Sequence, residues 1–345
     1  MNNIYDLDLI DLEQYFLDHN EKKYRAKQLF EWLYLKRISD FSQASNLSKK
    51  QLEQLKNDFV FDGLRIKEKQ ESKDGTIKYL FELYDGNLIE TVLMKYDYGN
   101  SICVSSQVGC NMSCRFCASG QLTKQRDLSA GEMVAQIIMI QKDLDSLQER
   151  VSHLVVMGIG EPFDNYDNVM KFVKIVNNPH GLAIGARHIT ISTCGLIAGI
   201  NRYQEENLQT NLAISLHSAA DEQRSWLMPI NKSNNLAELK KALQKYYKKT
   251  KRRITFEYIV LKGVNDSQKD AKKLADYCKG LNVYVNLIPY NQIGETEFKK
   301  ISRQDCFRFY DYLKKLGVNV TIRKEFGSDI DAACGQLRSR MQGRD

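Results

Sequence analysis

Three cysteines, Cys110, Cys114 and Cys117, lie within eight residues of one another in the stretch CNMSCRFC. A structural zinc site takes four ligands, and so does a cubane iron–sulfur cluster held wholly by protein. No histidine lies nearby, so a zinc ion would need a fourth ligand from a distant part of the chain. The spacing therefore favours an iron–sulfur cluster in which one iron is left for a small-molecule chelator.

The elements that must position these cysteines alternate between strand and helix from about residue 100 onward. The strand candidates run from SICVSS (101–106) to NVTIRKEF (319–326), and helical patterns such as SAGEMVAQIIMIQKDL (129–144) separate them. This alternation predicts parallel strands joined by crossover helices, in either a barrel or an open sheet.

Polar residues follow four of the expected strands, in MGIGEP (157–162), STCG (192–195), SLHS (215–218) and YNQ (290–292). The three cysteines follow the first strand. In a parallel β/α barrel, the loops after the strands converge on the carboxyl edge, where ligands bind. The sequence therefore predicts one shared site at this edge.

The first 90 residues have a different pattern. Apolar residues recur at helical spacing in 11–20, 24–37 and 48–59, with Ser48 as a candidate cap. Alternating residues in 76–96 then surround the turn Asp85-Gly86-Asn87, which predicts a hairpin. This region is expected to form a small α+β domain.

Composition places the chain among globular proteins and leaves its partners open. Of its 345 residues, 43% are hydrophobic and 27% charged, and no apolar run is long enough to span a bilayer. The N-terminal residues lack a signal-peptide pattern, so we expect a cytoplasmic protein whose eight cysteines form no disulfide framework. The net charge of +7 is compatible with nucleic acid but does not establish it.

The CxxxCxxC spacing ahead of a β/α array, followed by GIGEP, resembles the signature of radical S-adenosylmethionine (SAM) enzymes. Further blocks are similar to the RlmN/Cfr family of radical SAM RNA adenine methyltransferases, and the similarity runs from about Leu88 to Leu337. The blocks, in order, are CVSSQVGCNMSCRFC, GIGEPFDN, ISLHS with MPIN, GVNDS, VNLIPYN and FGSDIDAACGQLR.

The resemblance implies an α/β fold, namely a partial parallel (β/α)6 barrel with a small, mainly helical N-terminal accessory domain. It implies an RNA-binding domain over 1–95, the radical SAM core over 96–327, and a C-terminal segment over 328–345 that carries a methyl-accepting cysteine. It also implies that Cys110, Cys114 and Cys117 hold one 4Fe–4S cluster and that two SAM molecules are used per turnover. The residues matching SAM-contacting positions are Gly160, Glu161, Ser192, Ser215, Leu216, His217 and Asn291.

Three further residues match catalytic positions of the family. Cys334 matches the methyl-carrying cysteine, and Cys103 matches the thiol that releases the product through a transient disulfide. Glu90 matches a proton acceptor, although either Glu90 or Cys103 could remove the proton from adenine C2. The implied partners are 23S rRNA, tRNA and an electron donor such as flavodoxin or ferredoxin, with no membrane and a monomeric enzyme.

Two related activities and one unrelated function stay open at this point. The family methylates either C2 or C8 of adenine, and Pro162 and Asn165 resemble the C2 type (RlmN), whereas the C8 type (Cfr) gives antibiotic resistance. A radical SAM enzyme acting on protein or a small molecule would leave Cys334 dispensable. An RNA-binding protein with structural zinc at the three cysteines is the alternative outside enzymes.

The remaining cysteines and the basic stretches have plainer explanations. Cys194, Cys278 and Cys306 are interpreted as small buried residues without a chemical role. The stretches 21–37 and 246–253 combine basic and aromatic residues, which suits RNA, but both patterns also describe ordinary helices with solvated charged faces.

Overall fold

The computed structural model describes residues 2–61, 63–291, 297–327, 329–330 and 332. Its framework is a ten-stranded sheet in the order β14-β13-β12-β11-β10-β9-β6-β5-β4-β3. Neighbouring strands from β6 to β14 are parallel, and β3, β4 and β5 extend the sheet in antiparallel fashion. The strands are β3 (Arg65–Glu71), β4 (Ile77–Glu82), β5 (Leu88–Tyr96), β6 (Gly99–Val104), β9 (Val151–Val156), β10 (Ile189–Thr193), β11 (Asn211–Ser215), β12 (Ile254–Val260), β13 (Val283–Pro289) and β14 (Val320–Ile322).

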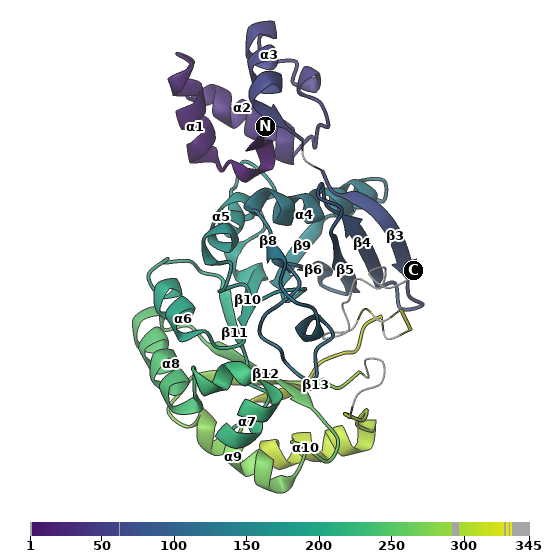
Figure 1. The fold of residues 1–345 in the computed structure, drawn as a ribbon, viewed down its shortest axis with the longest axis vertical. Coiled ribbons are helices and arrows are strands. Elements are labelled where there is room, and N and C mark those ends of the chain that lie inside the picture. Colours follow the sequence, from purple (N-terminus) through teal and green to yellow (C-terminus); the bar gives the residue numbers. More distant parts are fainter. Residues whose placement is uncertain (1, 62, 292–296, 328, 331, 333–345) are drawn as a thin grey trace.

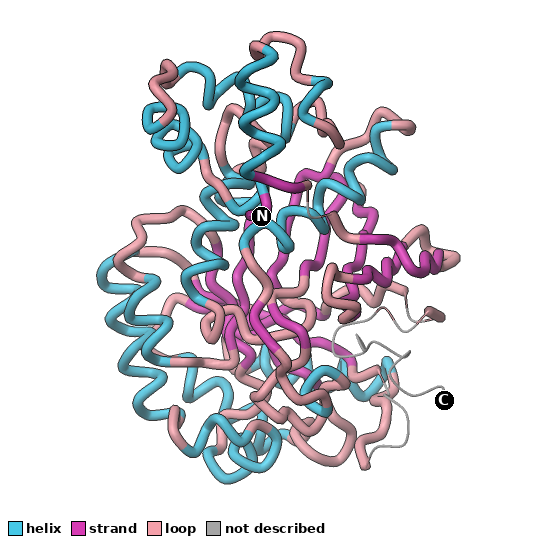
Figure 2. Tube along the Cα trace, turned by 45° about the horizontal axis from the view of Figure 1, so that its top comes forward, coloured by secondary structure: helices cyan, strands magenta, loops and turns pink. Residues whose placement is uncertain are grey.

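Helices cover the outer face of the curved sheet, and its two ends do not meet (Figures 1 and 2). This arrangement confirms the predicted partial barrel. Serine side chains cap three of the helices, accepting hydrogen bonds from backbone amides of the first turn at Ser129, Ser267 and Ser302. The helices are α4 (Ala130–Asp145), α5 (Tyr166–Asn177), α6 (Ile197–Tyr203), α7 (Asp221–Leu227), α8 (Leu236–Thr250), α9 (Gln268–Cys278) and α10 (Arg303–Lys315).

The N-terminal helices form a separate group at the top of Figure 1. Ser48 caps the third of them, as predicted. The group packs on the sheet helices through its buried aromatic residues: a Cβ added at Gly181, after α5, would lie 2.7 Å from the Phe30 ring and 3.2 Å from the Cβ of Tyr34. Its elements are β1 (Asn2–Asn3), η1 (Ile4–Asp6), α1 (Leu9–Asp18), α2 (Tyr24–Tyr34), η2 (Phe41–Gln43), α3 (Lys49–Asp58) and β2 (Phe59–Val60).

A polar contact also joins this group to the sheet helices. The backbone amide of Gly131, in the first turn of α4, donates to the carboxylate of Asp6 at 2.6 Å. A Cβ at Gly131 would lie 2.9 Å from Asp6, so a side chain there would force the contact apart. The negative carboxylate lies at the amino end of α4, where the helix dipole stabilises it.

The predicted hairpin around Asp85-Gly86-Asn87 is confirmed and joins β4 to β5. It places β3–β5 in the same sheet as the parallel strands. Within the described residues, no helix combines the length and apolar character needed to cross a membrane.

Candidate active site

The main cavity of the molecule lies at the carboxyl ends of the parallel strands, and its volume is about 920 Å³. All three cysteines of the CxxxCxxC stretch line it. The loop after β9 contributes Glu161, and the carboxyl ends of β10 and β11 contribute Ser192 and Ser215. The loops after β10 and β11 add Cys194 and His217. The predicted convergence of these loops on one site is therefore confirmed, and the volume is in the range of small-molecule sites.

The cysteine loop begins after β7 (Gln107–Val108) and ends at β8 (Arg126–Asp127), and these two strands pair in antiparallel fashion as a small separate sheet. Gly109 starts the loop with φ +76°, and a Cβ there would lie 2.2 Å from the carbonyl oxygen of Thr123. Glycine is therefore required at this crossing.

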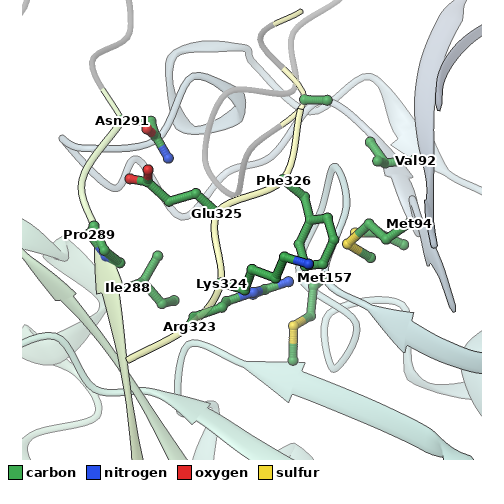
Figure 3. A pocket seen from close by; sticks show the side chains of 12 residues that line it. Val92, Met94, Met157, Ile288, Pro289, Asn291, Arg323, Lys324, Glu325 and Phe326 are labelled. Atoms are coloured by element: carbon green, nitrogen blue, oxygen red, sulfur yellow. The ribbon is translucent and has the colours of Figure 1, made fainter. Parts of the chain in front are cut away.

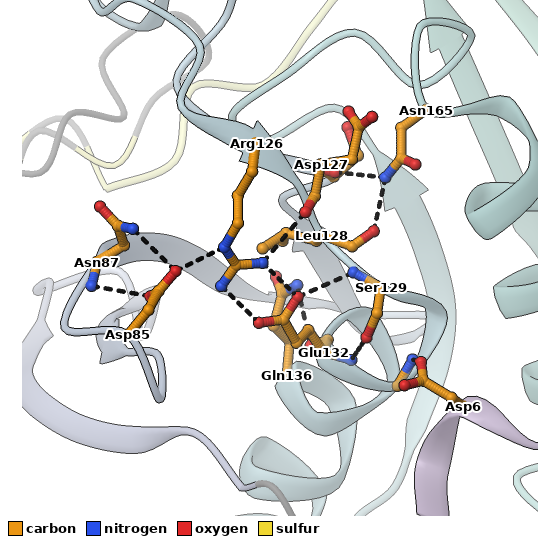
Figure 4. A network of polar contacts seen from close by, with 12 residues as sticks. Asp6, Asp85, Asn87, Arg126, Asp127, Leu128, Ser129, Glu132, Gln136 and Asn165 are labelled. Atoms are coloured by element: carbon orange, nitrogen blue, oxygen red, sulfur yellow. Dashed lines mark hydrogen bonds and ion pairs between the residues drawn. The ribbon is translucent and has the colours of Figure 1, made fainter. Parts of the chain in front are cut away.

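A network of ion pairs fixes the strand on which the loop returns (Figure 4). The Arg126 guanidinium binds Asp85 of the hairpin turn at 2.6 Å and both carboxylate oxygens of Glu132 in α4 at 2.8 Å. Asn165, after the GIGEP loop, donates to the backbone carbonyls of Ser106 and Leu128. The network joins the cysteine loop, α4 and the GIGEP loop.

Burial raises the pKa of all three thiols, and that of Cys110 reaches about 12, because a thiolate is poorly solvated in the cavity wall. A bound metal centre supplies the positive charge that stabilises thiolates in such a place. Among the described residues, no three His, Cys, Asp or Glu side chains converge tightly enough to hold a single metal ion, and these cysteines instead border a wider cavity. The donor set and its position fit a cluster.

The GIGEP loop is built from close backbone contacts. Gly160 has φ +112°, and a Cβ there would lie 2.7 Å from Ser106 and Gln107. The backbone amides of Ser106 and Gln107 donate to the carbonyl of Ile159 at 2.9 and 3.1 Å. A side chain at Gly160 would therefore separate the loop from the end of β6.

Glu161 is the buried carboxylate of this loop. It accepts hydrogen bonds from the backbone amides of Cys194 at 2.8 Å and Phe163 at 3.0 Å. Burial is nonetheless the largest influence and raises its pKa. A cationic ammonium group in the cavity would stabilise the ionised form of Glu161. This carboxylate is therefore the expected partner for the amino group of SAM.

The other predicted SAM-contacting residues occupy three different environments. The hydroxyls of Ser192 and Ser215 lie 3.4 Å apart in the wall of the main cavity, together with His217. Leu216 is fully buried in the hydrophobic core behind the wall. Asn291 lines a second cavity beside the first.

His217 is held in a left-handed backbone conformation, with φ +56°, which is uncommon for a side chain of this size. Its Nδ1 accepts a hydrogen bond from the backbone amide of Ile259 at 3.0 Å, so the ring is neutral with its proton on Nε2. Burial, and secondarily the nearby Arg224 charge, lowers its pKa to about 3.

This histidine should make stability depend on pH. Between pH 6.5 and about 3, the unfolded chain binds a proton that the folded His217 does not bind. The free energy of unfolding should fall as the pH is lowered through that window, by on the order of 1 kcal/mol per pH unit. Urea unfolding of wild type and His217→Gln at several pH values measures this, and equal slopes for the two proteins would contradict it.

Arg224 of α7 is a functional candidate that the sequence analysis missed. Its guanidinium is completely buried and donates to the carbonyls of Leu216 at 3.0 Å and Cys194 at 2.7 Å. It also donates to Asn231 at 2.7 Å and to the carbonyl of Ser215 at 3.2 Å. Arg224 therefore holds the ends of β10 and β11 in place behind the cavity. In the sequence, Arg224 is a single arginine in the short stretch DEQRSWL, and nothing in that stretch marks its side chain as buried.

Cys194 and the two helical cysteines fit their plain interpretation. Cys194 is buried, and its backbone bridges Glu161 and Arg224 through the contacts above. Cys306 is buried in α10, and Cys278 is partly buried at the end of α9.

Cys103 is among the residues that line the second cavity, of about 530 Å³. Figure 3 shows this cavity with Met157, Arg323 and Phe326 in its wall. The two cavities share Met157, Ile288 and Arg323 in their walls. On the remaining side, the segment after β14 closes the second cavity with Phe326 and Ala332. Cys103 thus lines a cavity that adjoins the main cavity.

The segment that leads to Cys334 is fastened to the turn between β3 and β4. The carboxylate of Asp329 accepts from the Ser72 hydroxyl at 2.5 Å and from the Lys73 amide at 3.3 Å. In the opposite direction, the Gly327 amide donates to Asp74 at 3.0 Å. Cys334 itself lies outside the described residues.

Glu90 is buried in β5 and lines neither cavity described above. It belongs to the same sheet face as Val92, whose strand neighbour is Cys103. Its carbonyl accepts from the Ser105 hydroxyl at 2.6 Å, and that hydroxyl accepts from the Ile159 amide at 3.0 Å. The backbone of Glu90 is therefore connected to the GIGEP loop.

The two basic stretches lie on helices. In α2, Phe30, Leu33 and Tyr34 are buried, which confirms a helix core, while Lys27 is exposed and Arg25 is half-buried. The stretch 246–253 ends α8 and precedes β12, so it lies at the amino edge of the sheet, opposite the cavities. Its positive charges fit the carboxyl end of a helix.

Comparison with known proteins agrees with this architecture. A family model of the radical SAM superfamily matches residues 104–277, and a model of the ribosomal RNA large subunit methyltransferase N-terminal domain matches residues 2–60. The crystal structure of a radical SAM methyltransferase from Sphaerobacter thermophilus superposes with a TM-score of 0.93 at 40% identity, covering 98% of this chain and 99% of that chain. The fold and the cavity therefore define a radical SAM enzyme, and membership in this superfamily implies a 4Fe–4S cluster and SAM.

The family can be specified further. Proteins named "Probable dual-specificity RNA methyltransferase RlmN" from Staphylococcus aureus strains JH9 and Newman are each 53% identical over 338 residues, which covers 98% of this chain and 93% of each relative. The chain belongs to the RlmN family of radical SAM RNA methyltransferases. The resemblance inferred from the sequence blocks is confirmed.

Proposed function

We propose that the enzyme methylates C2 of a specific adenine in 23S rRNA, and also an adenine beside the anticodon in some tRNAs. The name of the Staphylococcus aureus relatives, which specifies dual specificity, supports two RNA substrates. The sequence of the GIGEP loop supports C2, because Pro162 and Asn165 resemble the C2 type.

One observation carries the proposal: the Cys103 thiol opens on a cavity that shares three wall residues with the cysteine-lined cavity. A radical generated in the main cavity can therefore react in the adjoining cavity that Cys103 lines. When bound, one cluster per chain and SAM supply an electron and the 5′-deoxyadenosyl radical.

Cys334 carries the methyl group in this proposal. Adenine C2 is an electron-poor carbon and does not attack the SAM methyl group as an amine would. The Cys334 thiolate accepts a methyl group from a first SAM, and the radical from a second removes one hydrogen atom from it. The methylene carbon then bonds to C2, and the C2 proton leaves to Glu90 or Cys103. A cluster held by Cys110, Cys114 and Cys117 would accept the one electron that the adduct gives up.

Release requires a second thiol. The Cys103 thiolate attacks the sulfur of Cys334, so an S–S bond forms as the bond between sulfur and the methylene carbon breaks. The electron pair of the broken bond stays on that carbon, which takes up a proton and becomes the product methyl group. An external dithiol then reduces the disulfide, as is usual in a reducing cytoplasm.

RNA binding is assigned to the N-terminal helices together with the open side of the cavities. Exposed Lys22, Lys23 and Lys27 precede or lie on α2 and suit phosphate contacts. The target adenine must leave its stack to reach the cavity. A flavodoxin or ferredoxin serves as electron donor, and the enzyme acts as a cytoplasmic monomer.

The test is methylation of rRNA and tRNA fragments with isotope-labelled SAM by anaerobically reconstituted enzyme. After nuclease digestion, chromatography with mass spectrometry separates 2-methyladenosine from 8-methyladenosine. We expect label in the C2 isomer from both RNAs, and loss of all label in Cys334→Ala. Label in the C8 isomer would establish the alternative Cfr-type activity, and label in Cys334→Ala would contradict the mechanism.

A further inference from the structure

Lys78 is a lysine buried inside the sheet, with 7% of its surface exposed, and the mechanism above does not use it. It lies in β4 and is paired with Val92 of β5, which is paired in turn with Cys103 of β6. These three residues form one row across the inner face of the sheet. The next row contains Leu80 and Glu90.

Lys78 and Glu90 are therefore diagonal neighbours on this face. The Nζ atom of Lys78 lies 3.6 Å from a carboxylate oxygen of Glu90, and both side chains are buried, with 8% and 4% exposed. Lys67 of β3 provides a contrast, because its ion pair with Glu82 has 41% and 22% exposed. Solvent and salt screen the Lys67 pair but hardly reach the Lys78 pair.

Other charged and titratable groups lie on the neighbouring elements. Cys103 of β6 is the diagonal neighbour of Glu90 on the other side. The segment after β14 brings Arg323, Lys324 and Glu325 to the cavity beside Cys103. The Lys78 ammonium and the Glu90 carboxylate form an ion pair at 3.6 Å, close enough for each charge to favour the ionised form of the other.

We propose that Lys78 is a positioning residue that keeps Glu90 ionised and oriented to remove the proton from adenine C2. This inference rests on the proposed function and decides between its two candidate bases in favour of Glu90. A buried carboxylate without a counter-charge takes up a proton and cannot act as a base. The ion pair prevents that, and it leaves the Cys103 thiol for the release step.

The step is a simple proton transfer. The C2–H bond of the RNA adduct breaks, its proton goes to a Glu90 oxygen, and the electron pair of that bond restores the aromatic ring. The remaining unpaired electron would be accepted by the cluster that Cys110, Cys114 and Cys117 would hold. Lys78 gives up no proton in this step. Its positive charge, 3.6 Å away, stabilises the carboxylate that accepts the proton.

The test is single-turnover methylation of an rRNA fragment between about pH 6 and pH 9 by wild type, Lys78→Met, Lys78→Arg and the surface control Lys67→Met. We expect Lys78→Met to be slower at neutral pH by about tenfold or more, and to recover as the pH rises. It should also accumulate the covalent RNA adduct despite an intact Cys103. Lys78→Arg and Lys67→Met should keep the wild-type pH profile.

Two further measurements separate the possible failures. Cleavage of SAM and methylation of Cys334 precede proton removal, so Lys78→Met should retain both activities. If Lys78→Met loses both of them, and loses RNA methylation at every pH as well, Lys78 has a structural role and the inference is overturned. A wild-type pH profile in Lys78→Met would also overturn it. Absence of any adduct in Cys103→Ala would instead refute the proposed function.

If Lys78→Met fails to fold, the neutral pair Lys78→Met/Glu90→Gln keeps the test available, because replacing both charges avoids a buried unpaired one. We expect the double variant to match Glu90→Gln in its pH profile. If the double variant depends on pH differently from Glu90→Gln alone, Lys78 acts on a group other than Glu90.

Discussion

Replacing Cys103 by alanine is expected to leave the RNA covalently attached to the protein. The substitution removes the thiol that faces the second cavity but leaves the cysteine-lined cavity unchanged. Radical formation and addition to the base should therefore proceed, and the S–C bond to Cys334 should persist because no thiolate attacks it. Multiple turnover should stop after the first event on each enzyme molecule.

A denaturing gel with labelled RNA measures this directly, and mass spectrometry of the digested adduct should locate the modified nucleotide on the peptide that contains Cys334. Cys278→Ala is a suitable control, because this cysteine is partly buried in α9 and has no assigned role. It should release product as wild type does. Free methylated RNA from Cys103→Ala, with no adduct, would refute the assigned role of this thiol.

Replacing Arg224 by methionine should have the largest effect on stability. The substitution leaves four buried oxygen acceptors without their donor, on Leu216, Cys194, Ser215 and Asn231. Each unsatisfied acceptor costs about 1–3 kcal/mol, and partial relaxation should leave a loss of about 4 kcal/mol in the free energy of unfolding. SAM affinity should fall by at least about tenfold, because these backbone groups adjoin the cavity wall.

Urea unfolding and equilibrium binding of SAM to the reconstituted protein check both effects. Arg224→Lys should be intermediate, because an ammonium group cannot match the planar set of guanidinium donors. Arg308→Met is the matched surface control, since Arg308 is exposed and its ion pair is with Asp305 in the same turn of α10. Equal stability of Arg224→Met and Arg308→Met would show that the buried contacts contribute little.

The parallel strands and the shared cavity were predictable because their signals are local. Hydrophobic alternation gives the strands, and polar residues directly after them give the edge that binds ligands. The placement of Gly160 and Glu161 in the cavity wall follows from this pattern, as does that of His217. Their roles as SAM contacts remain predictions.

What could not be predicted depends on contacts between distant parts of the chain. Nothing local to Arg224 indicates that four oxygens from other elements converge on it. The sequence indicates the burial of Lys78 only weakly: the alternation in TIKYLF places this lysine on the same strand face as Leu80. The attachment of Asp329 to Ser72 joins residues 257 positions apart, and sequence periodicity carries no information on such pairs.

The antiparallel strands β3–β5 have a practical consequence for exchanging parts between relatives. They share a continuous hydrogen-bonded ladder with β6, so Lys78 and Glu90 belong to the wall that carries Cys103. A chimera joined near residue 95 would exchange half of that wall together with the N-terminal helices. A change in RNA preference could then not be distinguished from a change in the catalytic steps. A junction directly after Val60 would exchange the helical group alone, so any change of substrate could be attributed to recognition.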